Sequence, residues 1–268
     1  MRFHKIVLAS FVFALNAGIV NATVVEDIKA SEEGAKKFSP APKLIEADGE
    51  KVFTAPPKSY PTYCLPKVKV DPAKKYRVSV KLKQNGDVAP WVYIGFIPYD
   101  IKNRCISPHH GFLNTPKSMT ALTADVAKGA KSITVKDASA WKSGKYYFVA
   151  FNVKEDMSDI PNFELAGLIT KIEKTGDVYT IEFSKPLAKD YPAGTKVRQH
   201  RAAGTYIYTK CGKAPKEWTV WKGWDAYGKA LRQGVYLKPM IMINARQEGS
   251  GVIFTDFKYE EIPIETKE

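Results

Sequence analysis

The stretch YRVSVKL, at residues 76–82, alternates apolar and polar residues without a break. A period of two places successive side chains on opposite faces, as in a β-strand with one buried face. Turn-forming residues bound the stretch, with Asp71-Pro72 before it and Asn85-Gly86-Asp87 after it. The sequence therefore predicts a half-buried strand here, and this strand sets the pattern for the rest of the chain.

The neighbouring segments extend this β pattern. Residues 91–97, WVYIGFI, are apolar on both faces, which is typical of a central strand. Further strands are predicted at residues 131–135, 146–151, 165–172, 178–183, 196–200, 240–244 and 252–259. Pro239 predicts that its strand lies at a sheet edge or begins there. One short helix is expected at residues 31–38. Short strands separated by glycine and proline predict an all-β sandwich or barrel.

The N-terminal 22 residues have the three-part pattern of a secretory signal peptide. Arg2 and Lys5 form a basic start, residues 6–20 are mostly apolar, and Val20-Asn21-Ala22 fits a cleavage site. The apolar stretch is shorter than the roughly 20 residues that a spanning helix needs. We therefore expect cleavage after Ala22, no membrane span, and a secreted protein in the extracellular space or the periplasm.

Composition and charge narrow the classes of partner. The chain has 268 residues, 44% hydrophobic and 12% aromatic, which excludes a disordered protein. Its net charge of +13 attracts polyanions. For an exported protein, an acidic polysaccharide or a cell envelope is expected rather than nucleic acid. The dispersed lysines are equally compatible with a role in solubility alone.

Five stretches carry a resemblance to a known class of module. They are residues 70–80 (VDPAKKYRVSV), 94–100 (IGFIPYD), 218–221 (WTVW), 234–239 (GVYLKP) and 255–260 (TDFKYE). Together they resemble the opening, middle and closing strands of carbohydrate-binding modules of the galactose-binding jelly-roll type. The resemblance implies a jelly-roll β-sandwich that binds an extracellular polysaccharide without catalysis.

The resemblance covers residues 65–118 and 206–268, less than half of the chain. The intervening residues 119–205 are expected to form an inserted small β domain, because insertion at a loop tip leaves the host core intact. Residues 23–64 are expected to be an N-terminal arm with edge strands. The alternative is two consecutive domains that meet near residue 118.

Aromatic and basic side chains are the candidate ligand-binding residues. A sugar ring presents apolar C–H patches that stack on an aromatic face, and polar side chains then contact its hydroxyl or carboxylate groups. We predict that the ligand contacts Trp91, Tyr93, Arg104, Trp221, Trp224 and Arg246. The alternative for each aromatic residue is packing in the core. Trp218 and Trp221 face opposite sides of a regular strand, so one of them is expected in the core.

Two further features concern metals and cysteines. Modules of the resembled type often hold a structural calcium ion, and Asp256 in the closing strand is the candidate ligand. The three cysteines, Cys64, Cys105 and Cys211, allow one disulfide in an exported protein, and the sequence leaves its pairing open.

Two other functions stay open. Jelly-roll polysaccharide lyases pair a proton acceptor with groups that neutralise a uronate, and His110, Tyr99 and Arg104 are the residues for such an enzyme. Two adjacent histidines such as His109 and His110 are more often loop residues with a structural hydrogen bond. A surface or assembly protein would instead show an exposed apolar patch and self-association. The oligomeric state and the identity of the glycan cannot be read from the sequence.

Overall fold

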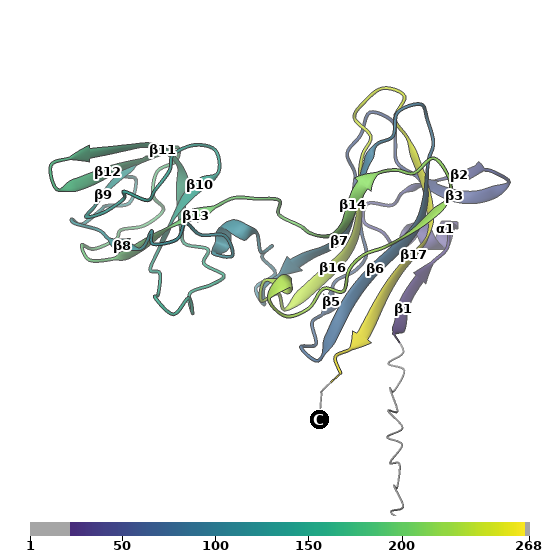
Figure 1. Cartoon of the computed structure of the whole chain (residues 1–268), viewed down its shortest axis with the longest axis horizontal. Coiled ribbons are helices and arrows are strands. Elements are labelled where there is room, and N and C mark those ends of the chain that lie inside the picture. Colours follow the sequence, from purple (N-terminus) through teal and green to yellow (C-terminus); the bar gives the residue numbers. More distant parts are fainter. Residues whose placement is uncertain (1–21, 266–268) are drawn as a thin grey trace, which may run out of the picture.

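The computed structural model describes residues 22–265 and shows a chain built almost entirely of strands (Figure 1). The helical elements are α1 (Glu32–Lys36) and two 3-10 turns, η1 (Pro108–His110) and η2 (Gly228–Leu231). The strands are β1 (Thr23–Ile28), β2 (Lys43–Ala47), β3 (Glu50–Thr54), β4 (Thr62–Cys64), β5 (Val68–Lys69), β6 (Lys74–Gln84), β7 (Trp91–Tyr99), β8 (Thr120–Ala121), β9 (Ser132–Val135), β10 (Tyr147–Phe151), β11 (Leu165–Thr175), β12 (Val178–Phe183), β13 (Lys196–Arg201), β14 (Ile207–Lys213), β15 (Thr219–Lys222), β16 (Tyr236–Asn244) and β17 (Val252–Pro263). The prediction of an all-β fold is confirmed. The predicted signal peptide, residues 1–22, lies outside the described residues except for Ala22.

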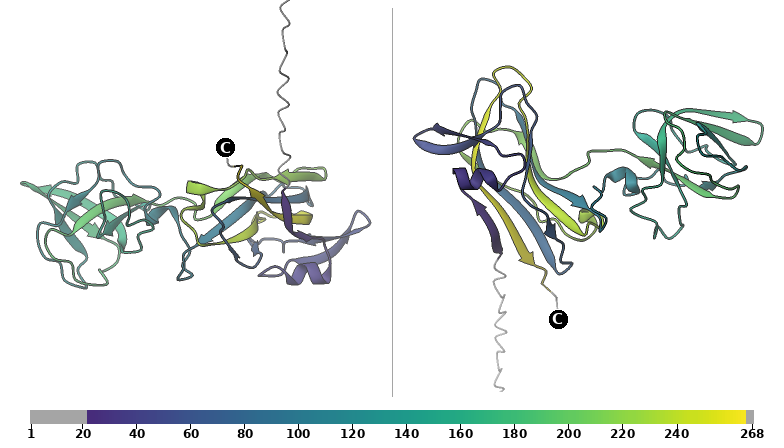
Figure 2. Two further views of the ribbon diagram at one scale, coloured as in Figure 1. Left: turned by 90° about the horizontal axis from the view of Figure 1, so that it is seen from below. Right: turned by 180° about the vertical axis from the view of Figure 1, so that it is seen from behind.

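Two antiparallel sheets form a β-sandwich (Figure 2). Sheet A has the strand order β15-β6-β17-β3-β2, and β1 also pairs with β17. Sheet B has the order β14-β7-β16-β4, and β5 also pairs with β16. One apolar core fills the space between the sheets, with buried residues from 28–96 and 207–259. Segments far apart in the chain therefore share this core.

The alternation at residues 76–82 produces β6 as predicted. Tyr76, Val78, Val80 and Leu82 are fully buried in the core. Between them Arg77 and Lys81 are partly exposed on the other face, where the small Ser79 is buried. In β7 both faces carry apolar side chains. Val92, Ile94 and Phe96 enter the sandwich core, whereas Tyr93, Ile97 and Tyr99 join a second apolar cluster on the outer face of sheet B, together with Met240 and Met242 of β16.

A third sheet, sheet C, is built from residues 120–201 in the order β8-β13-β10-β11-β12-β9. It surrounds a separate core that includes Trp141, Val149, Phe151 and Ile181. Residues 100–119 and 202–206, here called the neck, connect it to β7 and β14, and sheet C lies beside the sandwich in Figure 1. The predicted domain boundaries at residues 119 and 205 remain predictions.

Residues 23–64, predicted as an arm with edge strands, supply strands to both sheets. β1 and β3 pair with β17 in sheet A, and β4 pairs with β16 in sheet B. The expected helix is present as α1, where the Ser31 hydroxyl accepts a hydrogen bond from the Gly34 N–H at 2.9 Å as an N-cap. Within residues 22–265, no helix has the length and apolar character needed to cross a membrane.

One local prediction is wrong: β16 is a central strand, paired with β7 on one side and with β4 and β5 on the other. Pro239 is tolerated in its middle because it lies between the segments paired with β5 and with β4. No ladder donor is needed in this gap, and the Pro239 carbonyl still accepts a hydrogen bond from Leu65 N–H at 2.9 Å.

Candidate functional site

A cavity of about 440 Å³ opens at the end of sheet B where β7 begins and β16 ends. The β-ladder builds its floor, because Trp91 of β7 pairs with Lys213 of β14 on one side and with Asn244 of β16 on the other. The lining residues are Val88, Ala89, Pro90, Trp91, Lys213, Asn244, Arg246 and Gln247. An indole, two cationic groups and two amides therefore surround one hollow.

Trp91 offers an accessible aromatic face in this cavity. Its side chain is 45% exposed although it lies on a central strand. The ring stacks against Tyr93, with centroids 6.2 Å apart and planes 25° apart, and Tyr93 packs on Tyr208 of β14 with centroids 4.9 Å apart. A row of rings supports the indole, which stays exposed in a fixed position.

Arg246 is held beside the same cavity by an aromatic contact. Its guanidinium carbon lies 4.3 Å from the centroid of the Tyr60 ring. Stacking on an aromatic face limits the freedom of the guanidinium plane while its N–H groups remain available as donors. Such a group suits a carboxylate, a sulfate or a pair of hydroxyls on a bound sugar.

The structure thus brings together three of the six predicted ligand-binding residues, Trp91, Tyr93 and Arg246. Trp221 is placed differently, because its side chain is only 6% exposed and belongs to the sandwich core. Alternation along β15 explains this, since Val220 points outward and Trp221 inward. The prediction of stacking at Trp221 is therefore corrected to a core role.

Trp224 and Arg104 lie away from the cavity. Trp224 is 48% exposed, but it follows β15, and its backbone N–H donates to the Thr209 carbonyl. Arg104 is in the neck, where its guanidinium forms an ion pair with Asp100 at 2.7 Å and stacks 3.6 Å from the Phe163 centroid. Its charge is already matched, and it does not reach Trp91 across sheet B.

Asp256 does not have the surroundings of a calcium ligand. Its carboxylate accepts from the Lys29 ammonium at 2.6 Å, so a cation already occupies the place a metal would take. Among residues 22–265, no group of three or more histidine, cysteine or acidic side chains is arranged to hold a metal ion. Calcium prefers six to eight oxygen ligands, which this site does not provide.

Sequence reasoning missed three contributors to the cavity and its support: Tyr60, Tyr208 and Lys213. Tyr60 lies in an irregular, proline-rich segment that shows no periodicity. Tyr208 had a usable signal, since Tyr206 and Tyr208 alternate around the buried Ile207. Lys213 is one of many lysines, and only the strand register places it opposite Trp91.

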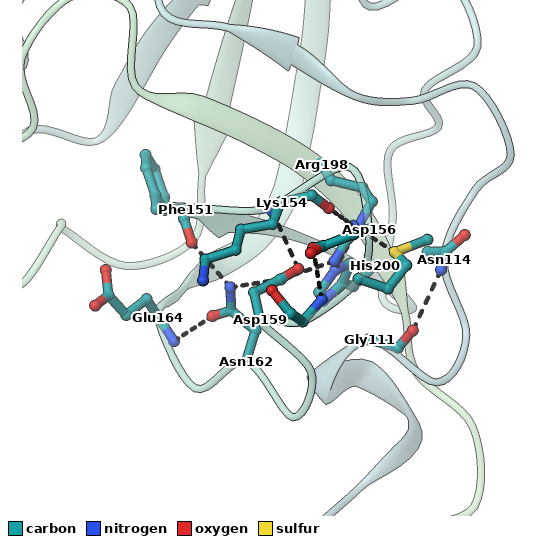
Figure 3. Close-up of polar contacts among 12 residues, drawn as sticks. Gly111, Asn114, Phe151, Lys154, Asp156, Asp159, Asn162, Glu164, Arg198 and His200 are labelled. Carbon is teal, nitrogen blue, oxygen red and sulfur yellow. Dashed lines mark hydrogen bonds and ion pairs between the residues drawn. The ribbon is translucent and has the colours of Figure 1, made fainter. Parts of the chain in front are cut away.

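A second polar cluster lies where the neck meets sheet C (Figure 3). Arg198 and His200 are two residues apart on β13 and therefore share a face. Arg198 forms a buried ion pair with Asp159 at 2.8 Å and donates from Nε to His200 Nε2 at 3.1 Å. The Asn162 side-chain amide donates to Oδ2 of the same Asp159 carboxylate at 3.1 Å and to the Phe151 carbonyl at 2.9 Å.

This Arg198 cluster fixes the protonation of His200. A guanidinium only donates, so His200 Nε2 accepts, and Nδ1 carries the hydrogen that is donated to the His109 carbonyl at 2.9 Å. Burial, together with the nearby Arg198 charge, lowers the pKa of His200 to about 4. The imidazole is therefore neutral at physiological pH, and the cluster fastens the loop at residues 152–164 to sheet C.

The residues of the lyase hypothesis do not form an exposed acid–base site. His110 is buried, its Nδ1 accepts from the Ser107 N–H at 2.9 Å, and its ring packs on Phe163. Burial, with His109 nearby, lowers its pKa to about 4. The ammonium groups of Lys67 and Lys238 lie 4.2 and 5.9 Å from the centroid of the Tyr99 ring.

The cysteines do not form a disulfide. All three are free, with Cys64 buried, Cys105 half-buried and Cys211 exposed. Burial raises the pKa of the Cys64 and Cys105 thiols, which keeps them protonated and unreactive.

A larger cavity, of about 630 Å³, lies between the neck and η2. Its lining is mainly apolar and includes Pro108, Leu113 and Ile160. Phe112, Asn114, Lys229, Arg232 and Gln233 also line it, but the Arg232 guanidinium is bound to the Thr205 and Tyr206 carbonyls. The Trp91 cavity has the more exposed aromatic face, and we take it as the candidate for a sugar site.

Fold and site together define a class: an all-β protein with an antiparallel sandwich that presents exposed aromatic and cationic side chains on one sheet. No family model, no curated protein and no solved structure matches this chain.

Proposed function

We propose that this protein is an exported β-sandwich that binds a polysaccharide, without catalysis, at the outer face of sheet B. The single observation that carries the proposal is the Trp91 cavity, in which an exposed, ring-supported indole lies beside Arg246, Lys213 and Asn244. A stacking face bordered by donors is the chemistry that a sugar ring requires.

Two further elements of the proposal come from the sequence. The signal-peptide pattern at residues 1–22 supports export, and the five stretches that resemble galactose-binding jelly rolls support a carbohydrate-binding module. In this proposal residues 119–205 are a small β domain inserted between β7 and β14, on the neck side of the sandwich.

Replacing Trp91 with alanine is expected to weaken glycan binding by about 1–3 kcal/mol, roughly 5- to 150-fold, by analogy with stacking on nucleic-acid bases. The melting temperature should hardly change, because the indole is half exposed. The purified chain beginning at Thr23 is first applied to a glycan array at low and high salt, and the affinity for the best glycan is then measured by calorimetry.

Trp224→Ala is the matched control, since Trp224 has nearly the same exposed fraction and does not line the cavity. It should bind like the unaltered protein. Equal losses in both variants would contradict a site at Trp91. Absence of binding to any glycan, together with self-association in solution, would favour the assembly-protein alternative.

A further inference from the structure

The outer face of sheet B has an ordered arrangement of side chains. Along β7 the outward positions are Trp91, Tyr93, Gly95, Ile97 and Tyr99, and the ladder places partners from β14, β16, β4 and β5 beside them. These partners are Cys211, Lys213, Tyr208, Asn244, Met242, Met240, Lys238, Tyr236, Thr62, Cys64 and Lys69. The row contains aromatic, thioether, thiol and cationic groups, and none of these residues is acidic.

The cations of this face are not matched by acidic partners. In the described part of the chain, the ion pairs include none of Lys67, Lys69, Lys213, Lys238 and Arg246. Three of them lie instead against tyrosine rings.

Acidic residues do occur in the turns next to this face. Glu248 is paired with Lys58 and Asp100 with Arg104, and Asp87 lies exposed in the turn before Val88. Two of these three charges are therefore already compensated, and the face remains cationic.

Sheet A differs in carrying carboxylates among its cations. Lys74 is paired with Glu261, Arg77 with Asp225, Lys258 with Asp27, and Lys83 with Asp48. Two other lysines of this sheet, Lys75 and Lys81, lie against the rings of Tyr227 and Trp218. The outward row of sheet B therefore carries cations without carboxylates among them, and it also carries the exposed aromatic cavity.

The cationic groups lie at both ends of β7. Lys213 and Arg246 border Trp91 at one end, and Lys67 and Lys238 contact the Tyr99 ring at the other. The eight residue steps between Trp91 and Tyr99 span ~26 Å at about 3.3 Å per residue. One sugar ring cannot reach both ends, whereas a polysaccharide chain can.

We propose, building on the function proposed above, that the ligand is an anionic polysaccharide whose sugars carry carboxylate or sulfate groups and which lies lengthwise along β7. Trp91 stacks on one sugar ring while Arg246 and Lys213 contact its acidic group. Lys67 and Lys238 contact an acidic group several sugars further along the chain.

The test compares matched pairs of polymers that differ only in charge. Binding of the purified protein is measured by calorimetry at 0.15 M and 0.5 M salt, with polygalacturonate against its methyl ester and dextran sulfate against dextran. We expect the charged member of at least one pair to bind at least about tenfold more tightly. The pair that shows the difference identifies the acidic group as carboxylate or sulfate.

Variants then separate a specific site from general attraction to a basic protein. The sheet B double variant combines Lys213→Gln and Arg246→Gln. The sheet A double variant combines Lys75→Gln and Lys222→Gln, and it removes the same amount of positive charge. The sheet B variant should lose about tenfold or more in affinity and the sheet A variant less than about twofold. Lys67→Gln with Lys238→Gln should weaken binding of the polymer but not of a disaccharide.

Each outcome has a distinct meaning. The proposal would be overturned in favour of non-specific attraction by either of two results. One is an equal loss of affinity in the sheet A and sheet B double variants. The other is that binding to both charged polymers is abolished at 0.5 M salt. Equal affinity for the neutral polymers would overturn the anionic ligand and leave the Trp91 site standing. Absence of binding to every polymer would overturn the proposed function itself. Circular dichroism checks that each variant remains folded.

Discussion

Replacing Arg198 with alanine is expected to lower the free energy of unfolding of sheet C by about 3–5 kcal/mol. The Arg198 and Asp159 side chains are only 3% and 6% exposed, so the substitution leaves a carboxylate buried without its countercharge. The same change removes the donor to His200 Nε2 and the donor to the Lys154 carbonyl at 3.2 Å. Chemical denaturation followed by circular dichroism measures the loss, and hydrogen exchange in β10 and β13 locates it.

Lys196→Ala is the matched control on the same strand. Lys196 forms an ion pair with Glu155 at 2.8 Å, but both side chains are more than half exposed. An exposed pair of this kind contributes about 0–1 kcal/mol, so this variant should unfold almost like the unaltered protein. A loss below about 1 kcal/mol for Arg198→Ala would contradict the argument, since it would mean that water or another cation reaches Asp159.

A double variant distinguishes the two parts of this effect. Arg198→Met with Asp159→Leu removes both charges and fills the volume with apolar groups. Replacing a complete buried pair in this way is often close to neutral. Recovery of most of the lost stability would assign the effect of Arg198→Ala to the uncompensated carboxylate rather than to lost packing.

The regular strands were predictable from the sequence because their signal is local. The alternation at residues 76–82 became β6, and the turn at residues 174–177 joins β11 to β12 as expected. Both depend only on side-chain period and turn residues, which act over a few positions.

The terminal strand shows where local reasoning fails. Simple alternation would place Phe254 and Asp256 on one face and Phe257 on the other, yet Phe254 and Phe257 are both fully buried in the core. A bulge between Thr255 and Lys258 shifts the phase by one residue, and Asp256 takes a positive φ of 51° there. A side-chain period of two cannot show such an extra residue, and Asp256, the candidate calcium ligand, lies at this same position.

The candidate site was predictable only in part for a related reason. Trp91 and Tyr93 share a face by alternation, so their proximity follows from the sequence. Lys213 reaches the same place through the register of β14 against β7, and Tyr60 and Arg246 reach it from segments outside the strands. These positions depend on contacts between distant parts of the chain, which a local pattern does not show. Alternation along β15 puts Trp221 on the opposite face from Val220, but the pairing of β15 with β6, in which Trp221 lies beside the buried Val80, decides that this face is the core side.

The stability of the protein is expected to fall steeply as the pH decreases from about 6.5 to about 4. Among residues 22–265 the histidines are His109, His110 and His200, and all three lie in or next to the neck. Burial lowers the pKa of His110 and of His200 to about 4, against an ordinary value of 6.5. Between these two pH values the unfolded chain binds protons at both residues while the folded protein does not.

The sign follows from this difference in bound protons. Stability is complete above about pH 6.5 and decreases as the pH falls, because protonation favours the state that takes up the proton. Each histidine contributes roughly 3 kcal/mol over the whole interval, and near pH 5 the two together give a slope of about 2.7 kcal/mol per pH unit. Carboxylates with lowered pKa, such as Asp100 and Glu164, add their effect below this interval.

Urea denaturation at pH 7, 6, 5 and 4.5 measures this slope, and His200→Gln should reduce it to about half. The Lys196→Ala variant should keep the full slope, because it leaves the histidines buried. A free energy of unfolding that stays constant between pH 6.5 and 4.5 would contradict the neutral, buried imidazoles described here.

Since His200 bonds both Arg198 and the His109 carbonyl, its protonation forces a second positive charge against the guanidinium. Acid should therefore open the Arg198 cluster first, and hydrogen exchange at pH 4.5 should show β13 losing protection before β6 and β7 of the sandwich.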